Sequence, residues 1–176
     1  TCCPTNTGTG MRASVMLHLP ALVITKQINK VLHTITKLGL TARGLYGEGT
    51  EASGNFFQIS NQVSLGRAEA ELMENIERIL KEVIHQEQTG RDALVTNNKI
   101  QLEDRIWRAY GILRHAKTMS STEALDLLSA VRLGVDLGLM NGLNRTTMNE
   151  LFIFSQPAHL QKLEGKTLTA KERDAK

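Results

Sequence analysis

The feature that most constrains the fold is the stretch of residues 43–60 (RGLYGEGTEASGNFFQIS), in which a polar, glycine-rich loop separates two short apolar segments. Residues 40–46 and 55–60 each have the length and apolar content of a β-strand, which makes residues 47–54 the loop between them. A loop with this much glycine and charge is costly to keep unless it contacts something charged. We therefore interpret it as part of a site for a charged ligand.

The first half of the chain predicts an α+β layer. A third strand is expected over residues 11–19 (MRASVMLHL), where apolar residues partly alternate and Pro20 ends the run. Apolar residues at helical spacing predict a helix over about residues 25–38, with Gly39 as its C-cap, and a long helix from the turn at 61–66 to about residue 88. The helices should cover one face of the sheet.

The second half predicts helices only. Residues 89–98 form the expected linker, and helices follow over about 101–117, from a capping box at Ser120 to about 137, after Asn144, near 157–164, and after a second capping box at Thr169. We predict two domains, residues 1–90 and 91–176. The chain starts without methionine and stops about one turn into its last helix, so we expect it to be a piece cut at both ends.

Composition narrows the class of protein. A chain of 176 residues with 41% hydrophobic residues can build a packed core. It has no apolar run long enough to span a bilayer and no signal-peptide pattern, which favours a cytoplasmic protein. The adjacent Cys2 and Cys3 cannot join distant parts of a fold, and the five histidines have no metal-ligand spacing, so no metal site is predicted.

Candidate site residues cluster in two stretches. Arg12 and Arg43 each lie at or beside a predicted strand, and glycines flank both. A guanidinium offers a fixed fork of donors for phosphate oxygens, and glycines let backbone N–H groups approach a polyphosphate, although two surface arginines in salt bridges remain an alternative. Glu48 could be a general base or a solvated turn residue. Cys3 could be a low-pKa thiolate or a small buried side chain.

Two motifs resemble a known family. Residues 3–15 (CPTNTGTGMRASV) and 43–61 (RGLYGEGTEASGNFFQISN) are similar to the two signature stretches of the ATP:guanido phosphotransferases. The resemblance covers residues 1–88. The variant RGLYGE and the added helical half are most similar to the bacterial branch that phosphorylates arginine side chains in proteins. The implied fold is the C-terminal part of a guanido-kinase catalytic domain, an antiparallel sheet flanked by helices, followed by a small all-helical domain.

The resemblance implies a role for each matching residue. Transfer of the γ-phosphoryl group of ATP, with Mg²⁺, would be in line. Glu48 would orient the acceptor guanidinium and help to remove its proton, and Cys3 would be the active-site thiolate. Arg173 and Asp174 match the start of an allosteric phosphoarginine-binding motif. ATP binding is implied for Arg12, Ala13, Ser14, Val15, Met16, Arg43, Gly44, Leu45, Tyr46, Gly47 and Glu48.

Three positions depart from the family pattern. Gln58 stands where the creatine and arginine kinases often have aspartate, Met16 where a histidine is common, and Thr7 where leucine is usual. The first two affect the details of adenine, ribose or metal contact. The family's other carboxylate and several phosphate-binding arginines would lie upstream of residue 1, so this stretch holds about half of the implied site and is expected to be inactive alone.

The implied partners are proteins. They are arginine-bearing substrates such as repressors or unfolded proteins, a Clp-type protease system, an activator protein, and a second copy bound through the helical domain, with no membrane and no direct nucleic acid. The alternative function is a helical module for phosphoarginine sensing, dimerisation or adaptor binding, without catalysis of its own. A third reading, nucleic-acid binding, rests on an isoelectric point near 9.0 and a basic, aromatic helix over residues 105–114.

Overall fold

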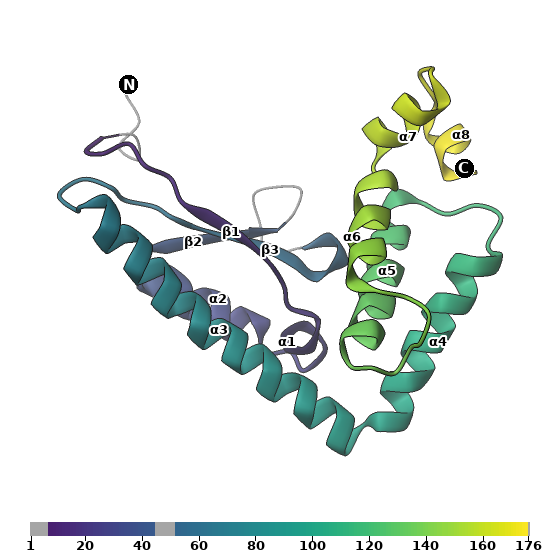
Figure 1. Ribbon diagram of the computed structural model, residues 1–176, viewed down its shortest axis with the longest axis horizontal. Coiled ribbons are helices and arrows are strands. Elements are labelled where there is room, and N and C mark those ends of the chain that lie inside the picture. Colours follow the sequence, from purple (N-terminus) through teal and green to yellow (C-terminus); the bar gives the residue numbers. More distant parts are fainter. Residues whose placement is uncertain (1–6, 45–51, 176) are drawn as a thin grey trace. The chain divides into compact units, whose positions relative to one another are not determined.

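A computed structural model of the protein describes residues 7–44 and 52–175 (Figure 1). The chain forms two compact units, Thr1–Ala93 and Leu94–Lys176. The family resemblance predicts an α+β fold with an antiparallel sheet flanked by helices. The first unit confirms that prediction, because it contains a small antiparallel sheet with helices packed against it.

The sheet has three strands in the order β1-β3-β2, and both pairings are antiparallel. The strands are β1 (Ser14–His18), β2 (Leu40–Gly44) and β3 (Phe56–Asn61). β1 and β2 lie within the segments that the sequence predicts, and β3 begins within its predicted segment and ends one residue beyond it. A short 3₁₀ turn, η2 (Ser53–Asn55), precedes β3. Because side chains alternate along a strand, the sheet has two faces of different composition.

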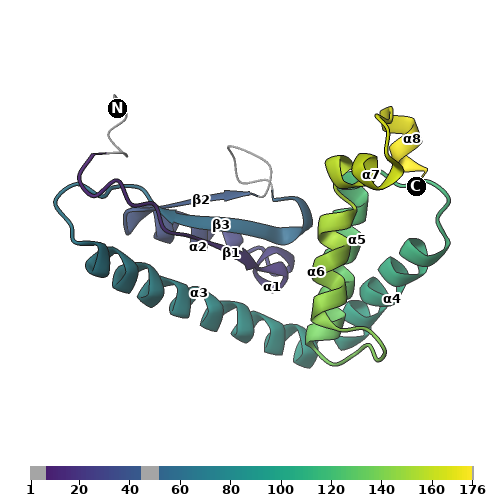
Figure 2. The same cartoon turned by 45° about the horizontal axis from the view of Figure 1, so that its top comes forward.

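Helices cover one of these faces. Figures 1 and 2 show α2 (Ile28–Lys37) and α3 (Glu69–Asn97) on the same side of the sheet. Their apolar stripes pack against every second residue of the strands, and the backbone turns after α2 at Gly39, which has the positive φ (80°) expected of a C-cap glycine. The main side chains of this core are Val31, Leu32, Ile35, Leu40, Phe57, Ile59, Ile76, Ile79 and Val83.

A short helix that the sequence did not predict, α1 (Pro20–Ile24), follows β1. Proline suits the first turn of a helix, so Pro20 ends the strand and also begins a helix. The N-terminus of α1 is capped by a distant carboxylate: Glu87, which is buried, accepts hydrogen bonds from the N–H groups of Ala21 (3.1 Å) and Leu22 (3.0 Å). Arg91 pairs with the same carboxylate at 2.7 Å.

The helix α3 is longer than the sequence predicts. The expected end near residue 88 precedes a glycine, but α3 continues through Gly90 to Asn97, so most of the predicted linker is helical. A Cβ atom at Gly90 would lie 3.3 Å from the Cβ of Ala21. The glycine therefore permits close packing against α1 and does not stop the helix.

Every regular element described in residues 98–175 is a helix. They are α4 (Lys99–His115), α5 (Ser121–Asp136), α6 (Arg145–Phe154), α7 (Pro157–Glu164) and α8 (Ala170–Asp174), close to the predicted ranges. At Gly134 a Cβ would lie 2.5 Å from Cγ2 of Ile106, so only glycine lets α5 approach α4 this closely. Ser120 and Asn144 cap α5 and α6, and Thr169 forms the predicted capping box with Glu172. No helix in the described ranges is long and apolar enough to cross a membrane.

Candidate functional site

The face of the sheet opposite α2 and α3 carries polar side chains. Strand register places Met16, Gln58 and Arg43 in one row across the three strands, and alternation puts all three on this face. Met16 and Arg43 are exposed, and Gln58 is half-buried between them. A neighbouring row on the same face contains Ser14, Ser60 and Thr41. We call these two rows the open face.

Two of the departures from the family pattern are neighbours. Gln58 and Met16 are direct cross-strand partners, and Arg43 is the partner of Gln58 on its other side. Opposed side chains in antiparallel strands lie about 5 Å apart and contact each other. The two departures therefore change one contact region beside Arg43, and not two separate ones.

Arg12 reaches the open face from the segment before β1. Its Nη2 donates a hydrogen bond to Oγ of Ser60 at 3.3 Å, and its side chain is exposed. Neither Arg12 nor Arg43 forms an ion pair with a carboxylate of the described residues. Two arginines thus emerge on the same face. Arg12 contacts Ser60, and Arg43 is the register partner of Gln58. Ser60 and Gln58 are two positions apart on β3, which is roughly 7 Å along the strand.

The backbone on both sides of Arg12 is held by Asn61. Its side-chain oxygen accepts the N–H of Ala13 at 2.8 Å, and its amide nitrogen donates to the carbonyl of Met11 at 3.0 Å. Asn61 is itself buried and anchored in β3. The sequence reasoning missed this role. The available signal was a polar residue at the end of an apolar strand.

A second tether lies further upstream. Ser64, which is fully buried, donates a hydrogen bond to the carbonyl of Thr7 at 2.7 Å. Gly8 has φ +77°, and a Cβ there would lie 2.7 Å from both Cα of Leu65 and O of Ser64. The sequence assigns this glycine to polyphosphate contact. The structure gives it another reason, which is close approach to the chain's own backbone.

The remaining predicted ATP-binding residues divide into three groups. Ser14 and Met16 lie on the open face, whereas Ala13 and Val15 alternate to the side of the helices, where Ala13 packs against the core. Gly44 is buried at the end of β2. Five predicted residues lie outside the described ranges: Cys3, Leu45, Tyr46, Gly47 and Glu48.

The open face offers few ligands for a metal. Over residues 7–44 and 52–175, no group of three His, Cys, Asp or Glu side chains is placed to hold an ion. The two rows contain hydroxyls, an amide, a thioether and a guanidinium, with no carboxylate. Such a surface suits an anion rich in oxygen acceptors.

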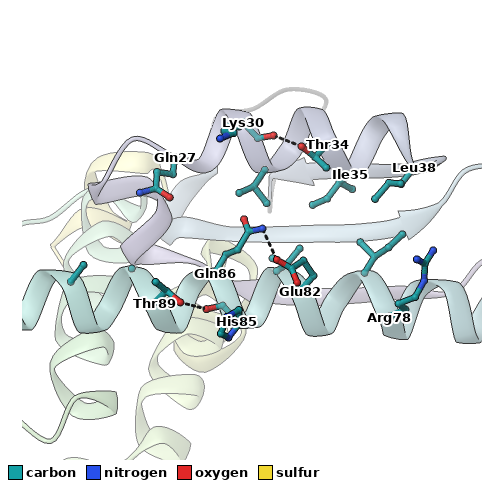
Figure 3. Close-up of a pocket in the computed structure, with 15 residues that line it drawn as sticks. Gln27, Lys30, Thr34, Ile35, Leu38, Arg78, Glu82, His85, Gln86 and Thr89 are labelled. Carbon is teal, nitrogen blue, oxygen red and sulfur yellow. Dashed lines mark hydrogen bonds between the residues drawn. The ribbon is translucent and has the colours of Figure 1, made fainter.

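A groove of about 620 Å³ lies between α2 and α3, away from the open face (Figure 3). Its walls include Val31 and Ile35 from α2, and Ile79 and Val83 from α3, with a rim that is polar. None of the predicted site residues lines it. The groove is therefore separate from the region to which the sequence assigns chemistry.

The helical unit has its own pocket, of about 700 Å³, lined by residues of α4 to α8. Arg173 and Asp174 both line it, together with Arg114 and Lys117 near the end of α4. The carbonyl of Asp174 accepts a hydrogen bond from the N–H of Met119 at 2.6 Å, which ties α8 to the loop before α5.

The capping box at the start of α8 perturbs one carboxylate. Glu172 accepts hydrogen bonds from the N–H and the hydroxyl of Thr169, both at 2.7 Å. These contacts, the backbone one first, lower the pKa of Glu172 below its ordinary value. Glu172 is ionised at neutral pH and holds the first turn of the helix that carries Arg173.

The basic, aromatic part of α4 is partly paired within the helix. Trp107 and Tyr110 form an edge-to-face ring pair with centroids 5.9 Å apart. Arg108 binds both oxygens of Asp104, and Arg114 donates to the hydroxyl of Tyr110. The cationic charge that suggested nucleic acid is therefore partly balanced on its own helix.

Comparison with known proteins places the chain in a family. The family model for the ATP:guanido phosphotransferase C-terminal catalytic domain matches residues 1–90, and the model for the C-terminal domain of the protein-arginine kinase McsB matches residues 99–176. Proteins named protein-arginine kinase are similar along the whole chain: 53% identity over 174 residues in Halalkalibacterium halodurans, 55% over 174 in Desulforamulus reducens, and 51% over 174 in Bacillus subtilis.

Each alignment covers 99% of this chain but only 49%, 49% and 48% of the respective relative, so the chain spans about half the length of the relatives it matches. The first family model covers the whole α+β unit up to Gly90, including both signature stretches and the open face. The chain belongs to the ATP:guanido phosphotransferase family.

Proposed function

We propose that the protein containing this chain is an ATP-dependent protein-arginine kinase, and that the open face contributes to its nucleotide site. One observation carries the proposal: Arg12 and Arg43 emerge on the side of a single small sheet opposite α2 and α3, about two residues apart along β3. Two guanidinium groups at this spacing suit the oxygens of a polyphosphate. The relatives are named protein-arginine kinase, so we propose the arginine side chain of a protein as the acceptor of the phosphoryl group.

For phosphoryl transfer, the protein mainly has to position the two substrates and neutralise the charge of the phosphates. In-line transfer moves the γ-phosphoryl group from the leaving oxygen of ADP to a nitrogen of the acceptor guanidinium. That guanidinium is protonated at neutral pH and must lose a proton to attack. We assign this task to Glu48 and, from the family resemblance, the role of active-site thiolate to Cys3. Arg12 and Arg43 neutralise the phosphate oxygens.

Mg²⁺ belongs to the nucleotide in this proposal. Protein-bound magnesium typically keeps several waters and is shared with substrate phosphates. The described part of the open face supplies no carboxylate for it, so these residues do not by themselves fit a metal held by protein.

The test is phosphorylation of an arginine-rich protein by the natural full-length protein, with and without Glu48→Gln. We expect an acid-labile phosphoarginine signal that falls by about 100-fold or more in the variant, as for loss of a general base. Glu51→Gln is the matched control, because it removes a second carboxylate from the same loop without an assigned role. An unaffected Glu48→Gln variant would remove Glu48 from the mechanism.

A binding role for the helical unit is the second candidate. It is favoured by the pocket that Arg173 and Asp174 line together with two further cations, Arg114 and Lys117. Those groups suit a phosphorylated guanidinium, which carries a positive charge on the guanidinium and negative charge on the phosphoryl group. If the full-length protein binds ATP but forms no phosphoarginine in the test above, this sensing or adaptor role would replace catalysis.

The remaining partners follow from the family resemblance. We propose arginine-bearing repressors or unfolded proteins as substrates, a Clp-type protease system and an activator protein as associates, and a homodimer through the helical unit. We also propose that the protein works in the bacterial cytoplasm.

A further inference from the structure

The amide of Asn61 occupies an unusual position relative to Arg12. It accepts from the N–H of Ala13 and donates to the carbonyl of Met11, so it contacts the main chain immediately before and after Arg12. An antiparallel partner strand would offer the same donor and acceptor. The side chain of Asn61 thus continues the β1–β3 ladder beyond the point where β1 begins, at Ser14.

The anchor of this amide is rigid. Asn61 is 8% exposed, its N–H donates to the carbonyl of Ala13 at 3.3 Å, and its register partner on the other side is Leu40 in β2. It is therefore held by the sheet on one side and holds the Arg12 segment on the other. Ser60, the preceding residue, accepts a hydrogen bond from the Arg12 guanidinium itself.

We propose that Asn61 is a positioning residue for phosphate binding, acting through Arg12. Its amide fixes the backbone of Arg12, and Ser60 fixes the direction of the guanidinium, so that this group lies over the same face as Arg43 before ATP arrives. Preorganisation of this kind lowers the entropy that binding would otherwise lose. The inference rests on the proposed function, because it requires Arg12 to contact the nucleotide.

The expected effect is selective. Asn61→Ala removes both hydrogen bonds from the Arg12 segment and should raise the Kd and KM for ATP about tenfold. The KM for the protein substrate should remain within about twofold, because no acceptor contact is assigned to Asn61. A purely structural role would instead lower the amount of folded protein and reduce kcat, without singling out ATP.

A double-mutant cycle in the natural full-length protein makes the test decisive. ATP affinity is measured for the wild type, Asn61→Ala, Arg12→Ala and the double variant. If Asn61 acts through Arg12, its substitution costs about tenfold in the wild type and less than about twofold when Arg12 is already alanine. That non-additive result supports the inference.

Two results would overturn the positioning role of Asn61, and only one of them would also overturn the proposed role of Arg12. If Arg12→Ala weakens ATP binding but Asn61→Ala costs the same factor in both backgrounds, only the positioning role is lost. If Arg12→Ala leaves ATP affinity unchanged, the proposed role of Arg12 fails, and the inference fails with it.

A second variant covers the case in which Asn61→Ala does not fold. Asn61→Asp keeps the shape and the acceptor for the N–H of Ala13 but cannot donate to the carbonyl of Met11, so the same cycle should show a smaller coupling of the same sign. Ser64→Ala is the matched control, because it removes the buried tether to Thr7, five residues before Arg12. It should lower stability with less than about twofold change in ATP affinity, and an ATP defect equal to that of Asn61→Asp would contradict the inference.

Discussion

The two regions to which binding is assigned are held in opposite ways. The segment around Arg12 is fixed by contacts across about half of the first unit, from Asn61 to Met11 and Ala13, at sequence separations of 50 and 48 residues respectively. The helix α8, which carries Arg173 and Asp174, begins with an exposed capping box whose two residues are three positions apart, and a backbone hydrogen bond from Met119 to the carbonyl of Asp174 ties it to the loop before α5.

This difference predicts different behaviour. Contacts that link distant segments through a buried core open only when much of the unit opens, whereas a helical turn held mainly by exposed local bonds opens at low cost. We therefore expect the open face to be preformed for its ligand. The pocket at α8 should respond to anything that stabilises or loosens one helical turn.

The largest expected effect comes from the core beneath the open face. Ile59 is fully buried on the helix-covered side of β3. Ile59→Ala should lower the free energy of unfolding of the first unit by about 2–4 kcal/mol, because it leaves a cavity under the central strand. Native-state hydrogen exchange of the amides in residues 56–61 measures this change.

The same experiment tests whether the two regions are independent. Ile59→Val is the graded control and should cost about 0.5–1.5 kcal/mol. Amides of α8 should keep their exchange rates in both variants. Equal loss of protection in α8 and in β3 would show that the two regions share one cooperative unit, and the contrast drawn above would be wrong.

A smaller effect, on ATP affinity and not on stability, is expected for a substitution on the other face of the same sheet. Arg43→Ala should weaken ATP binding by about 10- to 100-fold through loss of charge-assisted hydrogen bonds to phosphate. The unfolding free energy should change by less than about 0.5 kcal/mol, because the side chain is exposed. Calorimetric titration with ATP, beside thermal unfolding, measures both.

Lys37→Ala controls for this result, because Lys37 is an exposed cation on α2, which packs on the opposite side of the sheet from Arg43. It should leave ATP affinity unchanged within about twofold. An Arg43→Ala variant with normal affinity and normal folding would show that the open face does not bind the phosphates.

The contrast between local and distant contacts also explains what the sequence could predict. The strands, most helices, the C-cap at Gly39 and the box at Thr169 each leave a signal within a few neighbouring residues, and each was predicted. The helix α1 and the last nine residues of α3 depend on contacts of Glu87 and Gly90 with α1, about 65 residues away. No local pattern encodes such contacts.

The same limit applies to the site. Glycines and strand ends identified Arg12 and Arg43, and the register of the sheet then placed both on one face. The roles of Asn61 and Ser64 could not be predicted from spacing, because their partners, Met11, Ala13 and Thr7, lie about 50 residues or more away. The family motif contains Asn61, but only the structure gives a physical reason for an amide there.

The smallest expected effect concerns the capping box of α8, and its sign is fixed by the pKa of Glu172. Hydrogen bonds from Thr169 lower that pKa in the folded state from the ordinary value of 4.5, so the carboxylate stabilises α8 fully above that ordinary value, and the contribution is lost as the pH falls through the folded-state pKa. Amides of α8 should exchange faster in Glu172→Gln than in the wild type at pH 7. This difference should shrink as the pH falls through the lowered pKa of Glu172, whereas Glu150→Gln, an exposed change on α6, should have no effect on α8 at either pH. If Glu172→Gln leaves exchange in α8 unchanged at pH 7, the helix is held instead by its contact with Met119, and the region is less locally determined than the comparison with the open face implies.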